Sequence, residues 1–145
     1  MIMSAKGREP VPESLTCIHR IELYILHLNP SQPNSYRVYE DHYHVLMYMK
    51  TNNGSTWSEV FLNEANRPAD WVYWASWYEK FLHRKYVGEA ELQADVLASM
   101  TLPHLPKAQL IYDALHLIKD RKTSFGPPEE VSKIVHEAEA YVCLF

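Results

Sequence analysis

Several features that often point to a function are scarce in this sequence. The chain of 145 residues contains two cysteines, Cys17 and Cys143, which lie near its opposite ends. We therefore expect two reduced thiols in a cytoplasmic protein rather than a disulfide. No apolar run approaches the roughly 20 residues that a membrane helix needs, and the first residues lack the apolar core of a secretory signal. The sequence thus predicts a cytoplasmic protein that has no membrane partner.

A surplus of positive charge is also missing. Lysine and arginine total 14 against 18 aspartates and glutamates, so the formal net charge is -4. Non-specific binding to nucleic acid needs a basic face, and we expect no nucleic-acid partner. Internal repeats and low-complexity runs are absent, and the length suits a single domain. We predict a flexible N-terminal arm over residues 1–16 and one domain over residues 17–145.

Alternating apolar residues predict three antiparallel strands in the first half of the domain. The first strand begins after Cys17, and its Ile21, Leu23 and Ile25 alternate with polar or aromatic residues. The second strand covers residues 41–51 and the third covers residues 55–61. Between them, Asn52, Asn53 and Gly54 are expected to supply the positive φ angles of a two-residue hairpin.

Helical spacing replaces this alternation after Pro68. Trp71, Trp74 and Tyr78 predict a first helix with a buried face, and Gly88 is expected to end it. Further helices are predicted over residues 89–99, 107–122 and 129–140, and an apolar tail over residues 141–145 follows. The helix over 107–122 is apolar nearly all round, which predicts a buried central position. Strands segregated from helices indicate an α+β fold, here a three-stranded antiparallel meander followed by about four helices.

Three motifs together resemble the N-terminal capping domain of the enolase superfamily, in its muconate-lactonizing and mandelate-racemase branch. Residues 18–24, Ile-His-Arg-Ile-Glu-Leu-Tyr, are similar to an opening strand that often reads I-x-x-I-E-x-Y. Residues 51–59 resemble the hairpin T-D-D-G-x-x-G-W-G-E, with one residue deleted and both later glycines absent. Residues 114–118, followed by Gly126 and Pro128, are similar to the helix A-L-W-D-L…G-x-P, with His116 replacing the tryptophan and Leu117 the aspartate.

The resemblance implies a stand-alone cap without its usual catalytic barrel. Family members continue into a barrel that carries the Mg²⁺ ligands and catalytic lysines, and no residue of this chain matches those positions. We therefore expect no catalysis by the chain alone and no cofactor. The family's two specificity loops correspond here to about residues 29–40 and 62–70.

Two functional hypotheses follow from this comparison. The first is a binding or accessory protein that acts as a homodimer or through a protein partner. An orphan cap must bury or repolarise the face that a barrel would cover, and the aromatic content and the apolar tail favour burial. The second is the lid of a two-chain Mg²⁺-dependent racemase, epimerase or dehydratase whose barrel is a separate chain.

Aromatic side chains are the candidates for a binding surface. The chain has 10 tyrosines and 4 tryptophans, residue types that are enriched at the centres of interfaces. Trp71 and Trp74 share a predicted core face. Tyr73 and Trp77 point away from that face, and they either are buried elsewhere or belong to a surface that binds a partner. The predicted substrate- or partner-binding residues are Tyr36, Tyr39, Trp57, Tyr73 and Trp77.

His42 and His44 are the weaker candidates for a metal site. They stand two residues apart and so point to the same side of the predicted second strand. Two imidazoles without a third ligand at a firm spacing are a weak signal. We therefore favour hydrogen-bonded histidines near a strand end and predict no metal.

Overall fold

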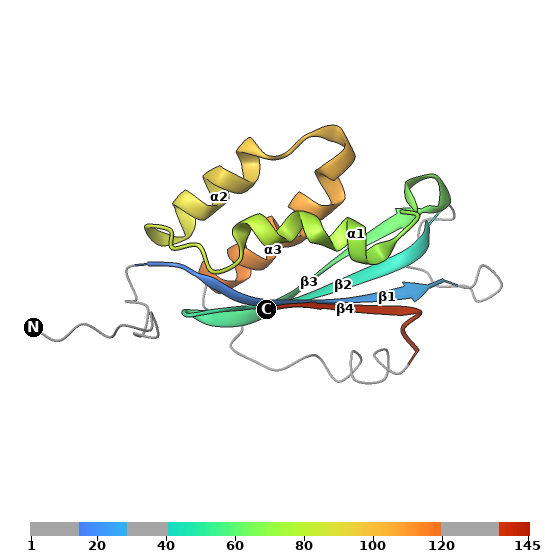
Figure 1. Cartoon of the computed structure of the whole chain (residues 1–145), viewed down its shortest axis with the longest axis horizontal. Coiled ribbons are helices and arrows are strands. Elements are labelled where there is room, and N and C mark those ends of the chain that lie inside the picture. The colour runs from blue at the N-terminus through green and yellow to red at the C-terminus, as the bar shows by residue number, and fades with distance from the viewer. Residues whose placement is uncertain (1–14, 29–40, 120–136) are drawn as a thin grey trace, which may run out of the picture.

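The computed structural model describes residues 15–28, 41–119 and 137–145. Within these ranges, a four-stranded antiparallel sheet carries the helices on one face (Figure 1). The sheet order is β3-β2-β1-β4, with β1 (Ile18–His27), β2 (Asp41–Thr51), β3 (Gly54–Asn63) and β4 (Ala140–Leu144). The helices are α1 (Trp71–Ala75), α2 (Gly88–Ala98) and α3 (Leu105–Lys119), with 3₁₀ turns η1 (Glu64–Asn66), η2 (Ser76–Phe81) and η3 (Leu102–His104). The predicted α+β class is confirmed.

The first three strands form the predicted meander. Ile21, Leu23 and Ile25 of β1 are fully buried beneath the helices. On β2 they pair in register with Met49, Met47 and Val45, which are also fully buried. The period-two alternation of the sequence therefore identified the face of the sheet that forms the core.

The turn between β2 and β3 differs from the prediction. Asn52 and Asn53 form the loop between the paired residues Thr51 and Gly54, and of these four residues only Gly54 has a positive φ, 143°. The asparagines were expected to share that conformation, which is wrong. Side-chain hydrogen bonds stabilise the observed turn instead. Asn53 N–H donates to Thr51 Oγ1 over 3.1 Å, and Asn52 Oδ1 accepts from Cys17 N–H over 2.8 Å.

The last strand corrects the prediction for the end of the chain. A helix was expected over residues 129–140, of which 129–136 lie outside the described residues, and an apolar tail was expected after it. Instead, β4 pairs antiparallel with β1, and the sheet has a fourth strand in place of a free tail. The prediction overlooked a short alternation in the sequence. Its apolar members, Ala140, Val142 and Leu144, pack against the same core as β1.

The first predicted helix is divided into two parts. The carboxylate of Asp70 caps α1 by accepting from Val72 N–H over 2.8 Å and from Tyr73 N–H over 3.4 Å. The chain then tightens into η2, which buries Tyr78 and Phe81. Gly88 does not end this segment, as predicted, but begins α2. Its φ of 79° suits a glycine and turns the chain into the new helix.

The helix α3 packs on the sheet through one face. Ser58 Oγ of β3 donates to the carbonyl of Leu110 over 2.7 Å, and Tyr78 OH donates to the carbonyl of Lys107 over 2.9 Å. Its outer side, which includes His116 and Leu117, is exposed, so the predicted buried central position is wrong for that side and right for the face on the sheet. The buried residues of α3 are Lys107, Ala108, Leu110, Ile111, Ala114, Leu115 and Ile118. In the described ranges, none of the helices has both the length and the apolar character that crossing a membrane requires.

Candidate interaction surface at the outer strand

The outer side of β4 is a free edge within the described part of the chain. This strand stands at one end of the sheet order, and β1 is its only partner there. Leu28 N–H donates to the carbonyl of His42 over 2.8 Å, in register with the β1–β2 ladder. Antiparallel backbone groups alternate between the two sides of a strand. The even-numbered residues of β1 therefore bond to β2, and its odd-numbered residues bond to β4.

This alternation decides which backbone groups of β4 point outward. Ile25 pairs with Ala140, Leu23 with Val142, and Ile21 with Leu144. These pairs use the inner side of β4. The N–H and C=O groups of Tyr141 and Cys143 must then point away from β1, where the described residues offer them no strand.

The β4 edge lacks the protection that exposed sheet edges usually carry. Its sequence, Ala-Tyr-Val-Cys-Leu, contains neither a charge nor a proline. Tyr141 is 50% exposed, and Phe145, directly after the strand, is 81% exposed. The helix α1 contacts β4 from the other face of the sheet, which the helices cover, and its Val72 and Tyr73 are 62% and 79% exposed. We call this set the β4 edge surface: Val72, Tyr73, Tyr141, Cys143 and Phe145.

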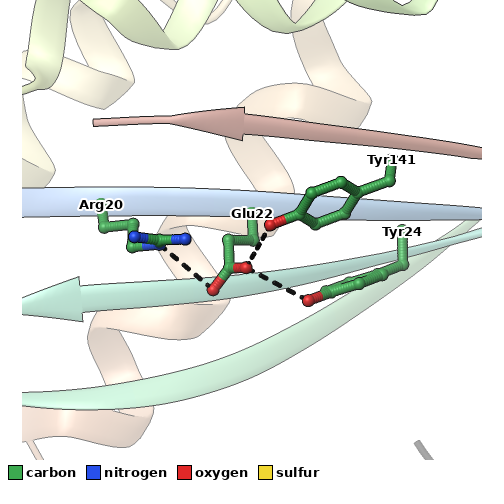
Figure 2. Close-up of polar contacts among 4 residues, drawn as sticks. All are labelled: Arg20, Glu22, Tyr24 and Tyr141. Atoms are coloured by element: carbon green, nitrogen blue, oxygen red, sulfur yellow. Dashed lines mark hydrogen bonds and ion pairs between the residues drawn. The ribbon is translucent and has the colours of Figure 1, made fainter. Parts of the chain in front are cut away.

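Glu22 of β1 holds Tyr141 in place from the neighbouring strand (Figure 2). Tyr141 OH donates to Glu22 Oε1 over 2.5 Å, and Tyr24 OH donates to the same oxygen over 3.2 Å. Arg20 Nε lies 3.4 Å from Glu22 Oε2. The four side chains occupy the sheet face opposite the helices, because they alternate with the residues that face the core.

The electrostatics of this cluster favour positioning over proton transfer. Burial raises the pKa of Tyr141, and its hydrogen bond to Glu22 raises that pKa further. Burial and the charge of Glu22 raise the pKa of Tyr24 in the same way. Both phenols therefore stay neutral hydrogen-bond donors near pH 7. The cluster fixes the Tyr141 ring on the edge strand.

Other aromatic contacts pre-orient the same edge. The Arg20 guanidinium carbon lies 5.7 Å from the centroid of the Phe145 ring, within cation–π range. The rings of Tyr141 and Tyr24 have centroids 4.9 Å apart. Side chains that are already held in place lose less conformational entropy when a partner binds.

The predicted binding residues are distributed over three places. Tyr73 belongs to the β4 edge surface. Trp57 is half-buried on the open sheet face, where its ring stacks on Tyr24 with centroids 5.7 Å apart. Trp77 is half-buried on the helical side of the sheet, packed against the core. Tyr36 and Tyr39 lie outside the described residues.

The two candidate metal ligands each lie near a separate carboxylate. His44 Nε2 is 2.7 Å from Glu59 Oε2, and the His44 ring stacks on Phe61 with centroids 4.4 Å apart. His42 Nδ1 is 4.0 Å from Glu64 Oε2. In residues 15–28, 41–119 and 137–145, no group of three or more His, Cys, Asp or Glu side chains is placed to hold a metal ion.

Sequence reasoning pointed to residues 141–145 as an apolar tail for burial on a partner, but it missed that residues 140–144 form a strand. The alternation in residues 140–144 was a usable signal, since Tyr141 and Cys143 stand between three apolar residues. The pairing of Tyr141 with Glu22 had no signal, because 119 positions separate the two residues.

Cys17 and Cys143 are both free thiols.

Comparison with protein-family models, with curated proteins and with solved structures finds no match for this chain. The resemblance to an enolase-superfamily cap therefore stays a prediction from three motifs, and so does the hypothesis of a lid for a separate barrel.

Proposed function

We propose that this chain is a non-catalytic binding protein that associates with a second copy of itself through the β4 edge surface. The observation that carries the proposal is the outer side of β4, which is uncharged and unpaired in the described residues. An edge of this kind is a ready template for another strand.

The partner that fits this edge best is a second copy. Around a two-fold axis each group meets its own kind, so charges near the axis would repel one another. The neutral sequence of β4 avoids that repulsion, whereas a foreign partner would gain from complementary charges. An antiparallel register with Val142 opposite Val142 of the second copy pairs every outward backbone group of Tyr141 and Cys143. One continuous sheet then runs through both copies.

The apolar groups of the surface set the strength of this association. Burying a large apolar side chain completely contributes about 1.5–3 kcal/mol, so the four exposed side chains of each copy, eight in the dimer, contribute roughly 12–24 kcal/mol at full burial. Loss of translational and rotational freedom costs about 4–15 kcal/mol. The two ranges overlap, and the backbone hydrogen bonds between the two β4 strands add to the free energy that favours association. We therefore expect a dimer that dissociates on dilution.

A proline substitution tests this proposal with a matched control. Cys143→Pro removes an outward N–H but no hydrogen bond to β1, so it should block pairing of the edge. Cys143→Ser removes the same thiol and keeps the N–H. Light scattering after size exclusion should give twice the 17.0 kDa chain mass for the wild type and Cys143→Ser, and the single mass for Cys143→Pro.

Two outcomes would contradict the proposal. One is a wild type that stays at the mass of one chain up to its solubility limit. The other is a folded Cys143→Pro variant that dimerises as the wild type does. If Cys143→Pro fails to fold, amide exchange in the wild type decides, because the N–H groups of Tyr141 and Cys143 should become protected as concentration rises.

A further inference from the structure

A second cluster of functional groups lies where η2, η3 and the first turn of α3 meet. Lys107 is only 6% exposed. Its Nζ lies over two indole rings, 5.4 Å from the centroid of Trp74 and 5.8 Å from that of Trp77. Lys80 Nζ approaches the same Trp77 ring, 4.5 Å from its centroid. The His104 ring stacks on Trp77 with centroids 5.6 Å apart. Two ammonium groups and an imidazole thus surround one indole.

This cluster carries two ammonium groups, and no carboxylate pairs with either of them within the described part of the chain. The ion pairs found there involve neither Lys107 nor Lys80. Trp77 Nε1 and His104 Nδ1 are both buried without a hydrogen-bond partner. Buried polar groups are nearly always paired, and leaving one unpaired costs about 1–3 kcal/mol. The described residues therefore supply neither a partner for these two ring nitrogens nor a negative charge for the two lysines.

The sign of the local charge indicates which kind of partner the cluster would bind. Burial lowers the pKa of Lys107, and the nearby charge of Lys80 lowers it further. Burial, Lys107 and Lys80 together lower the pKa of His104. The positive N-terminal end of the 15-residue helix α3 lies at the same place. Tyr78 OH holds the backbone there through the carbonyl of Lys107.

We infer that Lys80, Trp77, His104 and Lys107 form a binding site for an oxyanion, supplied as inorganic phosphate or as the carboxylate of a small organic acid. A neutral hydroxyl or carbonyl group would accept hydrogen bonds but would leave the ammonium charge of the buried Lys107 uncompensated, whereas the exposed Lys80 is solvated. An oxyanion supplies acceptors and charge together. The surrounding indole rings reduce contact with water and strengthen the interaction. This site is separate from the β4 edge surface and does not depend on dimerisation.

Anion-dependent thermal unfolding of the full chain tests the inference. The wild type should unfold several degrees higher in phosphate or acetate than in chloride of equal ionic strength, because a ligand bound to the folded state stabilises it. A response to phosphate alone would identify a phosphate site, and a response to acetate would identify a carboxylate site. Isothermal titration with each anion should give an affinity about tenfold or more weaker for Lys107→Met.

Lys85→Met is the matched control, because Lys85 is an exposed lysine that also carries one charge. Phosphate stabilises many folded proteins through exclusion from their surface, and Lys107→Met would keep that general effect. The specific response should therefore be lost in Lys107→Met and retained in Lys85→Met.

A readout on the unmodified protein covers the case in which Lys107→Met does not fold. A bound anion stabilises the imidazolium form, so the pKa of His104 measured by NMR should rise as anion is added. Equal unfolding midpoints in all three salts, with an unchanged pKa of His104, would overturn the inference. Equal responses of Lys107→Met and Lys85→Met would overturn it as well.

Discussion

The hydrogen bond between Tyr141 and Glu22 should fasten the outer strand to the sheet. Tyr141→Phe removes the hydroxyl that donates to Glu22 Oε1 over 2.5 Å and keeps the ring. Hydrogen bonds to charged groups contribute about 1.5–3 kcal/mol when buried. Because half of Tyr141 is exposed, solvent screening reduces this, and we expect a loss of about 1 kcal/mol. For a chain of this size that loss lowers the unfolding midpoint by about 2–4 °C.

A double-mutant cycle separates this bond from the other effects of each substitution. The variants Tyr141→Phe, Glu22→Gln and their combination are compared by urea unfolding, at one protein concentration because dimerisation adds to stability. We expect a coupling energy of about 0.5–1 kcal/mol. Tyr112→Phe in place of Tyr141→Phe is the control. The Tyr112 ring packs beside His116 in the helical layer, away from Glu22, so its coupling energy with Glu22→Gln should be zero. A coupling energy of Tyr141→Phe with Glu22→Gln within about 0.3 kcal/mol of zero would refute the reasoning.

Three further changes test the fold. Asp70→Ala removes the cap of α1 and should cost about 1 kcal/mol in urea unfolding, with a loss below about 0.3 kcal/mol counting against the cap. Leu23→Ala empties a fully buried position and should cost about 2–5 kcal/mol, whereas a loss under about 1 kcal/mol would contradict its place in the core. The free energy of unfolding should fall above about pH 10, because burial raises the pKa of Tyr78, Tyr86 and Tyr141 above the unfolded value of about 10. These groups stabilise the fold below that pH, and the stabilisation is lost as pH rises through their folded values; a urea midpoint that stays constant from about pH 8 to 11 would contradict this.

The sequence predicted those parts of the fold whose pattern is local and long. The strands β1, β2 and β3 extend over enough residues for the alternation to be unambiguous. The helices α2 and α3 begin within one or two residues of their predicted N-terminal bounds. Such segments reveal their buried face because the period of the pattern matches the backbone.

The fourth strand gave only a short signal, and the contacts of the candidate sites gave none, because tertiary contacts decide both. The alternation in β4 extends over only five residues, too few to distinguish a strand from an unstructured apolar tail. Its pairing with the distant strand β1 decides its structure. Lys107 illustrates the same limit in a side chain. A lysine in a first helical turn is ordinarily exposed, and its burial among Trp74 and Trp77 is a tertiary contact. Trp77 was foreseen as a candidate, but its neighbours were not.

An isotope-filtered NOE experiment tests the central claim most directly. A mixture of labelled and unlabelled chains reports contacts between copies and excludes those within one chain. Pairing of the two β4 edges should give an intermolecular contact between the Hα atoms of Val142 in the two copies, because facing residues that do not exchange hydrogen bonds lie about 4.5 Å apart at Cα. A dimer in which the filtered contacts come from other residues, or a sample with no filtered contacts at its solubility limit, would contradict the account.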